Sequence, residues 1–206
     1  MAPRPTPVYL LIGFLSWPVL KLLFRYRVRG REHVPREGGF VLAANHISNF
    51  DPWAVGMGIF PRRFLRFMAK SELFWFPLGP FIKAAGAFKV RRGERDLEAI
   101  RVAEELARQG HVIAMFPEGT RRRKGLRKKW RPEAHTGAAR IALGADVPLV
   151  PAGIRGTDRL SRFGPLRVVY GEPVLIDDLR DLDPAEAARV ATRRLMERIR
   201  ALEESL

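Results

Sequence analysis

Phe40-Val-Leu-Ala-Ala44, followed directly by Asn45-His-Ile-Ser-Asn-Phe-Asp-Pro52, is the stretch that decides the fold. The five apolar residues follow two glycines and predict a short buried strand. The pair Asp51-Pro52 predicts the start of a helix, because aspartate favours the N-cap and proline the first helical position. His46 is therefore expected just after the end of a strand and just before a helix.

The rest of the chain repeats this alternation of strand and helix. Further strands are predicted over 64–69, 111–116, 149–154 and 168–170, and helices over 94–109, 134–144 and from Asp183 onward. Residues 71–85, rich in Leu, Phe, Trp and Pro, predict a broken apolar helix. The alternation favours an α/β fold with helices packed on a sheet. No internal linker is visible, so we expect an N-terminal segment, residues 1–27, and one domain, residues 28–206.

Composition limits the function. The chain has 206 residues and a net charge of +15, which predicts an anionic partner. Nucleic acid, an anionic membrane and a phosphorylated small molecule all satisfy that charge. The chain has no cysteine, so disulfides, thiol catalysis and cysteine-bound metals are excluded.

The N-terminus favours a membrane surface among these partners. The run from Val8 to Leu20 is uncharged but shorter than the roughly 20 residues that span a bilayer, and it contains Pro18. The basic stretch Arg25–Arg31 follows it, and no cleavage site typical of a signal peptide is present. This pattern predicts an interfacial helix, with Phe14 and Trp17 at the headgroups and the arginines facing anionic lipid. The alternative is a helix that packs on the protein's own core.

Two short motifs carry candidate chemistry. His46 and Asp51 are a candidate general base and the carboxylate that fixes its tautomer, although such pairs also occur as structural hydrogen bonds. Phe116-Pro-Glu-Gly-Thr-Arg121 follows a predicted strand and offers a glycine, a hydroxyl and a guanidinium, which together suit a phosphate. Glu118 would repel a phosphate, so it is expected to bind a substrate hydroxyl or to orient Arg121. The alternative for this motif is a surface turn.

Four stretches in this order resemble the glycerolipid acyltransferases, typified by lysophosphatidate acyltransferase. They are His46 with Asp51, Gly86 with Arg92, Phe116–Arg121 and the apolar stretch Val147–Pro151. The resemblance covers about residues 40 to 155, most of the chain. It implies a mixed β-sheet flanked by helices, like that of glycerol-3-phosphate acyltransferase, with an N-terminal membrane-docking helix.

The resemblance also implies an activity. A fatty acyl group would pass from acyl-CoA or acyl-carrier protein to the sn-2 hydroxyl of lysophosphatidate, giving phosphatidate in phospholipid synthesis at the cytoplasmic face of a membrane. His46 would act as the base oriented by Asp51, and Arg92, Glu118, Gly119, Thr120 and Arg121 would bind the acceptor. No cofactor or metal is expected, because a thioester is already activated.

Several alternatives stay open at this point. The acceptor could be another lyso-lipid or glycerol 3-phosphate, and a non-catalytic basic membrane-binding protein could keep the same fold. The eight basic residues from Arg121 to Arg131, both included, predict either a solvated loop or a patch for anionic headgroups. No nucleic-acid-binding module appears, so no specific nucleic acid is expected. The apolar run Leu73–Ile82 is interpreted first as core, with an acyl-chain tunnel or membrane contact as alternatives. His33, His111 and His135 are interpreted as structural.

Overall fold

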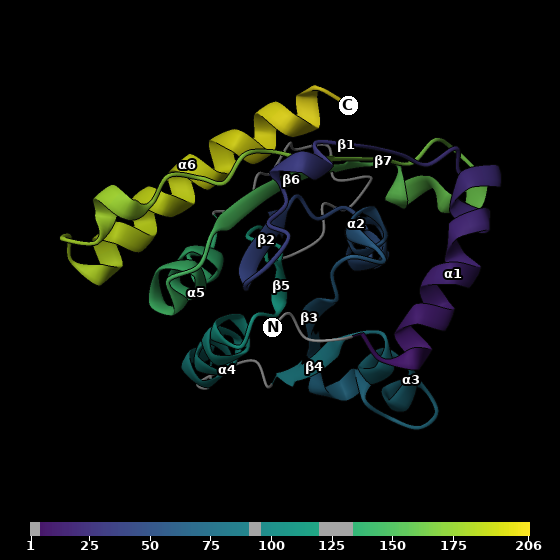
Figure 1. Ribbon diagram of the computed structural model, residues 1–206, viewed down its shortest axis with the longest axis horizontal. Helices are drawn as coiled ribbons and strands as arrows, with labels where there is room; N and C mark the ends of the chain where they lie inside the picture. Colours follow the sequence, from purple (N-terminus) through teal and green to yellow (C-terminus); the bar gives the residue numbers. More distant parts are fainter. Residues whose placement is uncertain (1–4, 91–95, 120–133) are drawn as a thin grey trace, which may run out of the picture.

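A single seven-stranded sheet organises the molecule, in the order β1-β7-β6-β2-β5-β3-β4 (Figure 1). In the computed structural model, which describes residues 5–90, 96–119 and 134–206, the strands are β1 (Arg27–Arg29), β2 (Phe40–Ala44), β3 (Leu65–Lys70), β4 (Ala87–Val90), β5 (Val112–Met115), β6 (Leu149–Arg155) and β7 (Arg167–Tyr170). The five strands from β6 to β4 are parallel, whereas β7 pairs antiparallel with β6 and β1 pairs parallel with β7. The sheet is therefore mixed, and the carboxyl ends of β6, β2 and β5 lie side by side.

Helices cover both faces of the sheet (Figure 1). One face carries α1 (Pro7–Leu22), α2 (Asp51–Ile59) and α3 (Leu78–Ala84), and the other carries α4 (Asp96–Arg108), α5 (Gly137–Ala145) and α6 (Pro184–Glu204). Successive side chains of β2 point to opposite faces of the sheet. Phe40, Leu42 and Ala44 join the core beneath α2, whereas Val41 and Ala43 join the core beneath α5 and α6. All five of these side chains are buried, as a central parallel strand requires.

The mixed α/β sheet flanked by helices is confirmed, and the predicted elements lie close to the observed ones. Strands β2, β3, β5, β6 and β7 each begin and end within two residues of the prediction. The last helix begins as its sequence indicates, with the Asp183 side chain accepting hydrogen bonds from the Ala185 and Glu186 backbone N–H groups.

Two expectations need correction, and β1 is absent from the sequence prediction. The middle of the basic stretch Arg25–Arg31 is strand β1, because Arg27–Arg29 pairs with Arg167–Val169 at the edge of the sheet. The apolar run 73–82 is not mainly core, since Trp75, Phe76 and Phe81 are each more than half exposed. Helix α5 begins at Gly137 rather than residue 134, because the His135 N–H donates to the Pro117 carbonyl and holds the preceding residues against the turn after β5.

Helix α1 packs on the protein along one side and is exposed along the other. Gly13 and Leu20 are buried against the protein, and Phe60 fills the space where a side chain at Gly13 would lie. The opposite side is exposed and apolar, with Leu11, Phe14, Leu15 and Leu22 each more than half exposed. Among the described residues, no helix is long and apolar enough to cross a membrane. The boundary between the two predicted segments, at residue 27, stays a prediction.

Candidate active site

His46 and Asp51 face each other at the carboxyl end of β2. The Nδ1 atom of His46 lies 2.7 Å from Oδ2 of Asp51, whose side chain is fully buried while that of His46 is 18% exposed. A carboxylate accepts hydrogen bonds and donates none, so Nδ1 carries the proton and Nε2 is left with its lone pair. In the neutral ring, Nε2 is therefore the nitrogen that can accept a hydrogen bond.

Asp51 is held by four donors. Its Oδ2 also accepts the backbone N–H groups of Ile47 and Ser48, at 2.7 and 2.8 Å, and its Oδ1 accepts the hydroxyl of Thr157. Asp51 is the first residue of α2, yet its side chain turns back toward the loop rather than capping its own helix. A buried carboxylate is tolerated only when its hydrogen bonds are satisfied, and here the loop that carries His46 supplies most of them.

Neighbouring elements fix the two ends of this loop. The Asn45 side chain accepts from the Ile154 N–H and donates to the Ile154 carbonyl, which ties the end of β2 to β6. The buried hydroxyls of Tyr26 and Tyr170 donate to the carbonyls of Ala54 and Val55, both at 2.6 Å. Burial raises the pKa of both tyrosines, so both stay protonated donors that hold α2 to the sheet.

The second motif begins beside the histidine. The ring of Phe116, which follows β5, stacks on the ring of His46 with centroids 4.4 Å apart and planes at 25°. The Gly119 N–H closes a turn by donating to the Phe116 carbonyl at 2.9 Å, and Glu118 within this turn is buried. Gly119 has φ +66°, and a Cβ there would meet the His135 ring at 2.5 Å, so glycine is required.

The structure thus brings together His46, Asp51, Glu118 and Gly119. Arg92, Thr120 and Arg121 lie outside the described residues, as does the basic run that ends at Arg131. Gly86 precedes β4 with φ +104°, and a Cβ there would lie 2.2 Å from the Leu65 carbonyl oxygen, which explains the glycine of that motif. Within the described ranges, no group of three His, Asp or Glu side chains is arranged to hold a metal ion.

Of the other histidines, two lie away from this centre and one touches the second motif. His33 contacts the Tyr170 carbonyl through Nδ1 at 3.1 Å, and His111 lies just before β5, at the opposite end of the parallel strands from His46. His135 packs on Gly119 and so touches the second motif, a contact that its sequence position did not indicate.

Thr157 is the site residue that sequence reasoning missed. It is 2% exposed, follows β6 and reaches Asp51 from 106 residues away in the chain. Its only sequence signal is its place just after a predicted strand, since ends of neighbouring parallel strands meet at one edge.

Comparisons with known proteins give the family and the fold. A family model described as Acyltransferase matches residues 25–155. A Bacillus subtilis protein named 1-acyl-sn-glycerol-3-phosphate acyltransferase is 32% identical over 91% of this chain and 93% of its own length. A Streptococcus pneumoniae protein of the same name is 28% identical over 84% of this chain and 67% of its own.

The fold has a solved counterpart. The crystal structure of the 1-acyl-sn-glycerophosphate (LPA) acyltransferase PlsC from Thermotoga maritima matches 95% of this chain and 77% of that one, with a TM-score of 0.65 and 24% identity. The fold and the paired motifs therefore define an α/β protein with a histidine–carboxylate centre at its strand ends. The chain belongs to the acyltransferase family.

Proposed function

We propose that the protein transfers a fatty acyl group from a thioester to the sn-2 hydroxyl of 1-acyl-sn-glycerol 3-phosphate, giving phosphatidate. The observation that carries this proposal is the stacking of Phe116 on His46, which sets the two motifs side by side at one edge of the sheet. The names of the bacterial relatives support the same acceptor.

The chemistry follows from the tautomer of His46. Nε2 takes the proton of the acceptor hydroxyl while that oxygen attacks the thioester carbonyl carbon and forms the new C–O bond. The C–S bond then breaks, and the departing thiolate takes the proton back from His46. Asp51 holds the ring in place and offsets the positive charge that His46 carries between these steps. A base of this kind contributes about 10²–10⁴ in rate.

The acceptor phosphate would bind at the turn that follows β5. In this proposal Glu118, Gly119, Thr120 and Arg121 contact the glycerol phosphate, and Arg92 assists. Arginine suits this role because its guanidinium makes paired hydrogen bonds to phosphate oxygens. The buried position of Glu118 is compatible with a carboxylate that orients a neighbouring group rather than one that meets the phosphate.

We also propose that the enzyme works at the cytoplasmic face of an anionic membrane. The exposed apolar side of α1 and the exposed aromatic residues Trp75, Phe76 and Phe81 support contact with lipid. Lysophosphatidate and the acyl product both reside in such a surface. Acyl-CoA or acyl-carrier protein would deliver the donor from the aqueous side.

The test is an acyl-transfer assay on the purified full chain. Radiolabelled acyl-CoA and acyl-carrier protein are offered with lysophosphatidate, other lyso-lipids and glycerol 3-phosphate, and products are separated by chromatography. We expect phosphatidate to form fastest, and we expect His46→Gln to reduce it by at least about 100-fold. His33→Gln is the matched control, because His33 is remote from the site.

Each other outcome has a definite meaning. Faster acylation of another acceptor would replace the proposed substrate. No thioester consumption with any acceptor would indicate a membrane-binding protein without catalysis. Full activity of His46→Gln in folded protein would overturn the assigned base.

A further inference from the structure

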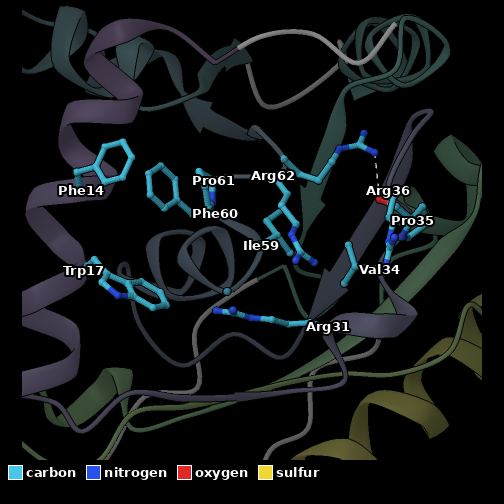
Figure 2. Close-up of a pocket in the computed structure, with 12 residues that line it drawn as sticks. Phe14, Trp17, Arg31, Val34, Pro35, Arg36, Ile59, Phe60, Pro61 and Arg62 are labelled. Carbon is cyan, nitrogen blue, oxygen red and sulfur yellow. Dashed lines mark hydrogen bonds between the residues drawn. The ribbon is translucent and has the colours of Figure 1, made fainter.

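A cavity of about 670 Å³ opens at the end of α2 opposite to His46. Its walls are the residues that end α2 and follow it, from Gly58 to Arg63, the segment from Arg31 to Arg36 and the side of α1 at Phe14 and Trp17 (Figure 2). Helix α2 has nine residues, so the cavity is about 12 Å from the Asp51 end at 1.5 Å per residue. The acyl-transfer centre is therefore not part of this cavity.

Four arginines line the cavity, and one of them is fully engaged by the protein. Arg63 is 4% exposed and donates to the carbonyls of Pro35, Gly38 and Gly110, with its guanidinium 5.2 Å from the centre of the Phe40 ring. Burial lowers the pKa of this guanidinium, and the charge of Glu37 opposes that shift. Arg63 thus builds the wall and adds positive potential.

In the described part of the chain, the three remaining arginines have no carboxylate partner. Among the described residues, Arg31, Arg36 and Arg62 form no ion pair, not even with Glu32 and Glu37 of the same segment. Figure 2 shows Arg31 extending toward Trp17 and Arg62 extending from the turn that follows α2. The Arg31 guanidinium lies 5.7 Å from the Trp17 ring centre. Unpaired guanidiniums around one concave space are suited to a phosphate.

The rest of the wall is aromatic and continues onto an exposed apolar surface. Phe14 and Phe60 meet edge to face with centroids 5.1 Å apart, and Trp17 packs beside them (Figure 2). Phe14 is 61% exposed and lies on α1 next to Leu11 and Leu15, which are also exposed. If a free phosphate occupied the cavity, the apolar wall would stay exposed to water. A phospholipid has a phosphate for the arginines and acyl chains that cover the apolar wall.

We propose that this cavity binds one anionic phospholipid of the bilayer, with its phosphate between Arg31 and Arg62 and its chains along Phe14 and Trp17. This inference rests on the proposed association with an anionic membrane. The site is separate from acyl transfer and gives the enzyme a specific attachment to that membrane. It also sets the face of α1 that meets the lipid, and hence the orientation of the strand ends above the surface.

The test measures binding of the full chain to vesicles by co-sedimentation. Vesicles of pure phosphatidylcholine are compared with equimolar phosphatidylcholine and phosphatidylglycerol. Two basic residues at an anionic surface are worth about 1 kcal/mol each, so we expect Arg31→Gln/Arg62→Gln to bind the anionic vesicles about 30-fold more weakly. The matched control is Arg193→Gln/Arg200→Gln, which removes two exposed charges from α6 on the other face of the sheet and should change binding by about twofold or less.

Further readouts distinguish a lipid site from a general effect of charge. Soluble dihexanoyl phosphatidylglycerol should displace the protein from anionic vesicles, and inorganic phosphate at the same concentration should not. Arg62→Gln alone changes an exposed residue and should reproduce part of the loss without affecting thermal unfolding. Turnover of a monomeric short-chain acceptor should be the same in the Arg31→Gln/Arg62→Gln variant as in the unmodified protein.

Three results would overturn the proposal. Equal losses in both double variants would mean that only overall charge matters. Displacement by inorganic phosphate would make the cavity a phosphate site rather than a lipid site. Loss of turnover on the soluble acceptor would make these arginines part of the reaction centre.

Discussion

The two ends of helix α2 use polar groups in opposite ways. At the first end, the buried Asp51 carboxylate accepts hydrogen bonds from His46, Ile47, Ser48 and Thr157. At the second end, Arg31, Arg36 and Arg62 surround a cavity without any ion pair among the described residues. A satisfied buried network fixes one geometry, whereas unpaired charges at a surface attract a partner. The same helix thus has the hydrogen-bonded His46–Asp51 network at one end and the arginine-lined cavity at the other.

The largest effect is expected at the first end. Asp51→Ala leaves the Thr157 hydroxyl, two backbone N–H groups and His46 Nδ1 without their acceptor, so the free energy of unfolding should fall by about 3 kcal/mol or more. Acyl transfer should fall by at least about 100-fold. His46→Ala should lose comparable activity with much less destabilisation, as measured by urea unfolding and the acyl-transfer assay. Similar stability losses in the two variants would mean that the carboxylate network does not hold the loop.

Thr157→Val tests the same network at one bond. Valine matches threonine in shape but leaves Asp51 Oδ1 without its donor, which should cost about 1–3 kcal/mol and reduce turnover about tenfold. The control is Thr192→Val, because within the described residues that buried hydroxyl donates to the Ala188 carbonyl of its own helix, at 2.7 Å, and to no other group. Equal effects on turnover in both variants would contradict the role of Thr157 in positioning Asp51.

Two glycines with nearly the same φ angle, one at each end of the parallel strands, allow a direct comparison of the two edges of the sheet. Gly119 at the strand ends has φ +66° and contacts the His135 ring, while Gly38 at the other edge has φ +69° and open space around its Cβ position. Gly38→Ala should cost only the backbone strain, about 1–2 kcal/mol. Gly119→Ala should cost more and should also lower turnover, and adding His135→Ala should recover the excess. Calorimetry measures the stability of each variant, and the activity assay measures its turnover. Equal losses of stability in Gly38→Ala and Gly119→Ala would refute the steric contribution of His135.

The smallest effect is a pH dependence at the second end. Burial first, and then the charges of Arg66 and Arg63, lower the pKa of His111 in the folded protein. The unfolded chain therefore takes up a proton more readily than the folded one as the pH falls through about 6.5, and stability decreases with it. His111→Gln should remove this part of the decrease in urea unfolding between pH 8 and pH 5. An unchanged pH dependence in that variant would show that His111 does not contribute.

The sequence predicted the features that local pattern determines. Short apolar runs placed most strands, and the spacing of His46 and Asp51 indicated a contact that the structure contains at 2.7 Å. Edge strand β1 was missed because three residues with two arginines have no strand signal of their own, and their partner lies about 140 positions away in β7. Thr157 was missed for the same reason, since only the parallel pairing of β6 with β2 brings it to Asp51.

The exposure of the aromatic residues in 75–81 could not be predicted from the sequence for a different reason. Their apolar composition indicates burial, but composition alone cannot distinguish a protein core from a surface that another phase covers. The cavity at the second end of α2 also could not be predicted from the sequence. Its arginines come from two segments of the chain, and these segments are held together by the hydrogen bonds that Arg63 donates to three backbone carbonyls.

The pairing of β1 with β7 has a consequence during synthesis. The Arg27 N–H donates to the Leu166 carbonyl, so the chain just after α1 gains its sheet partner only once residues near 167 have been made. At about 5–20 residues per second, the ribosome needs roughly 7 to 28 seconds for that interval. Throughout it the apolar side of α1 has no completed domain beneath it. In the proposed membrane attachment, α1 can meet the bilayer during this interval, before the domain is complete.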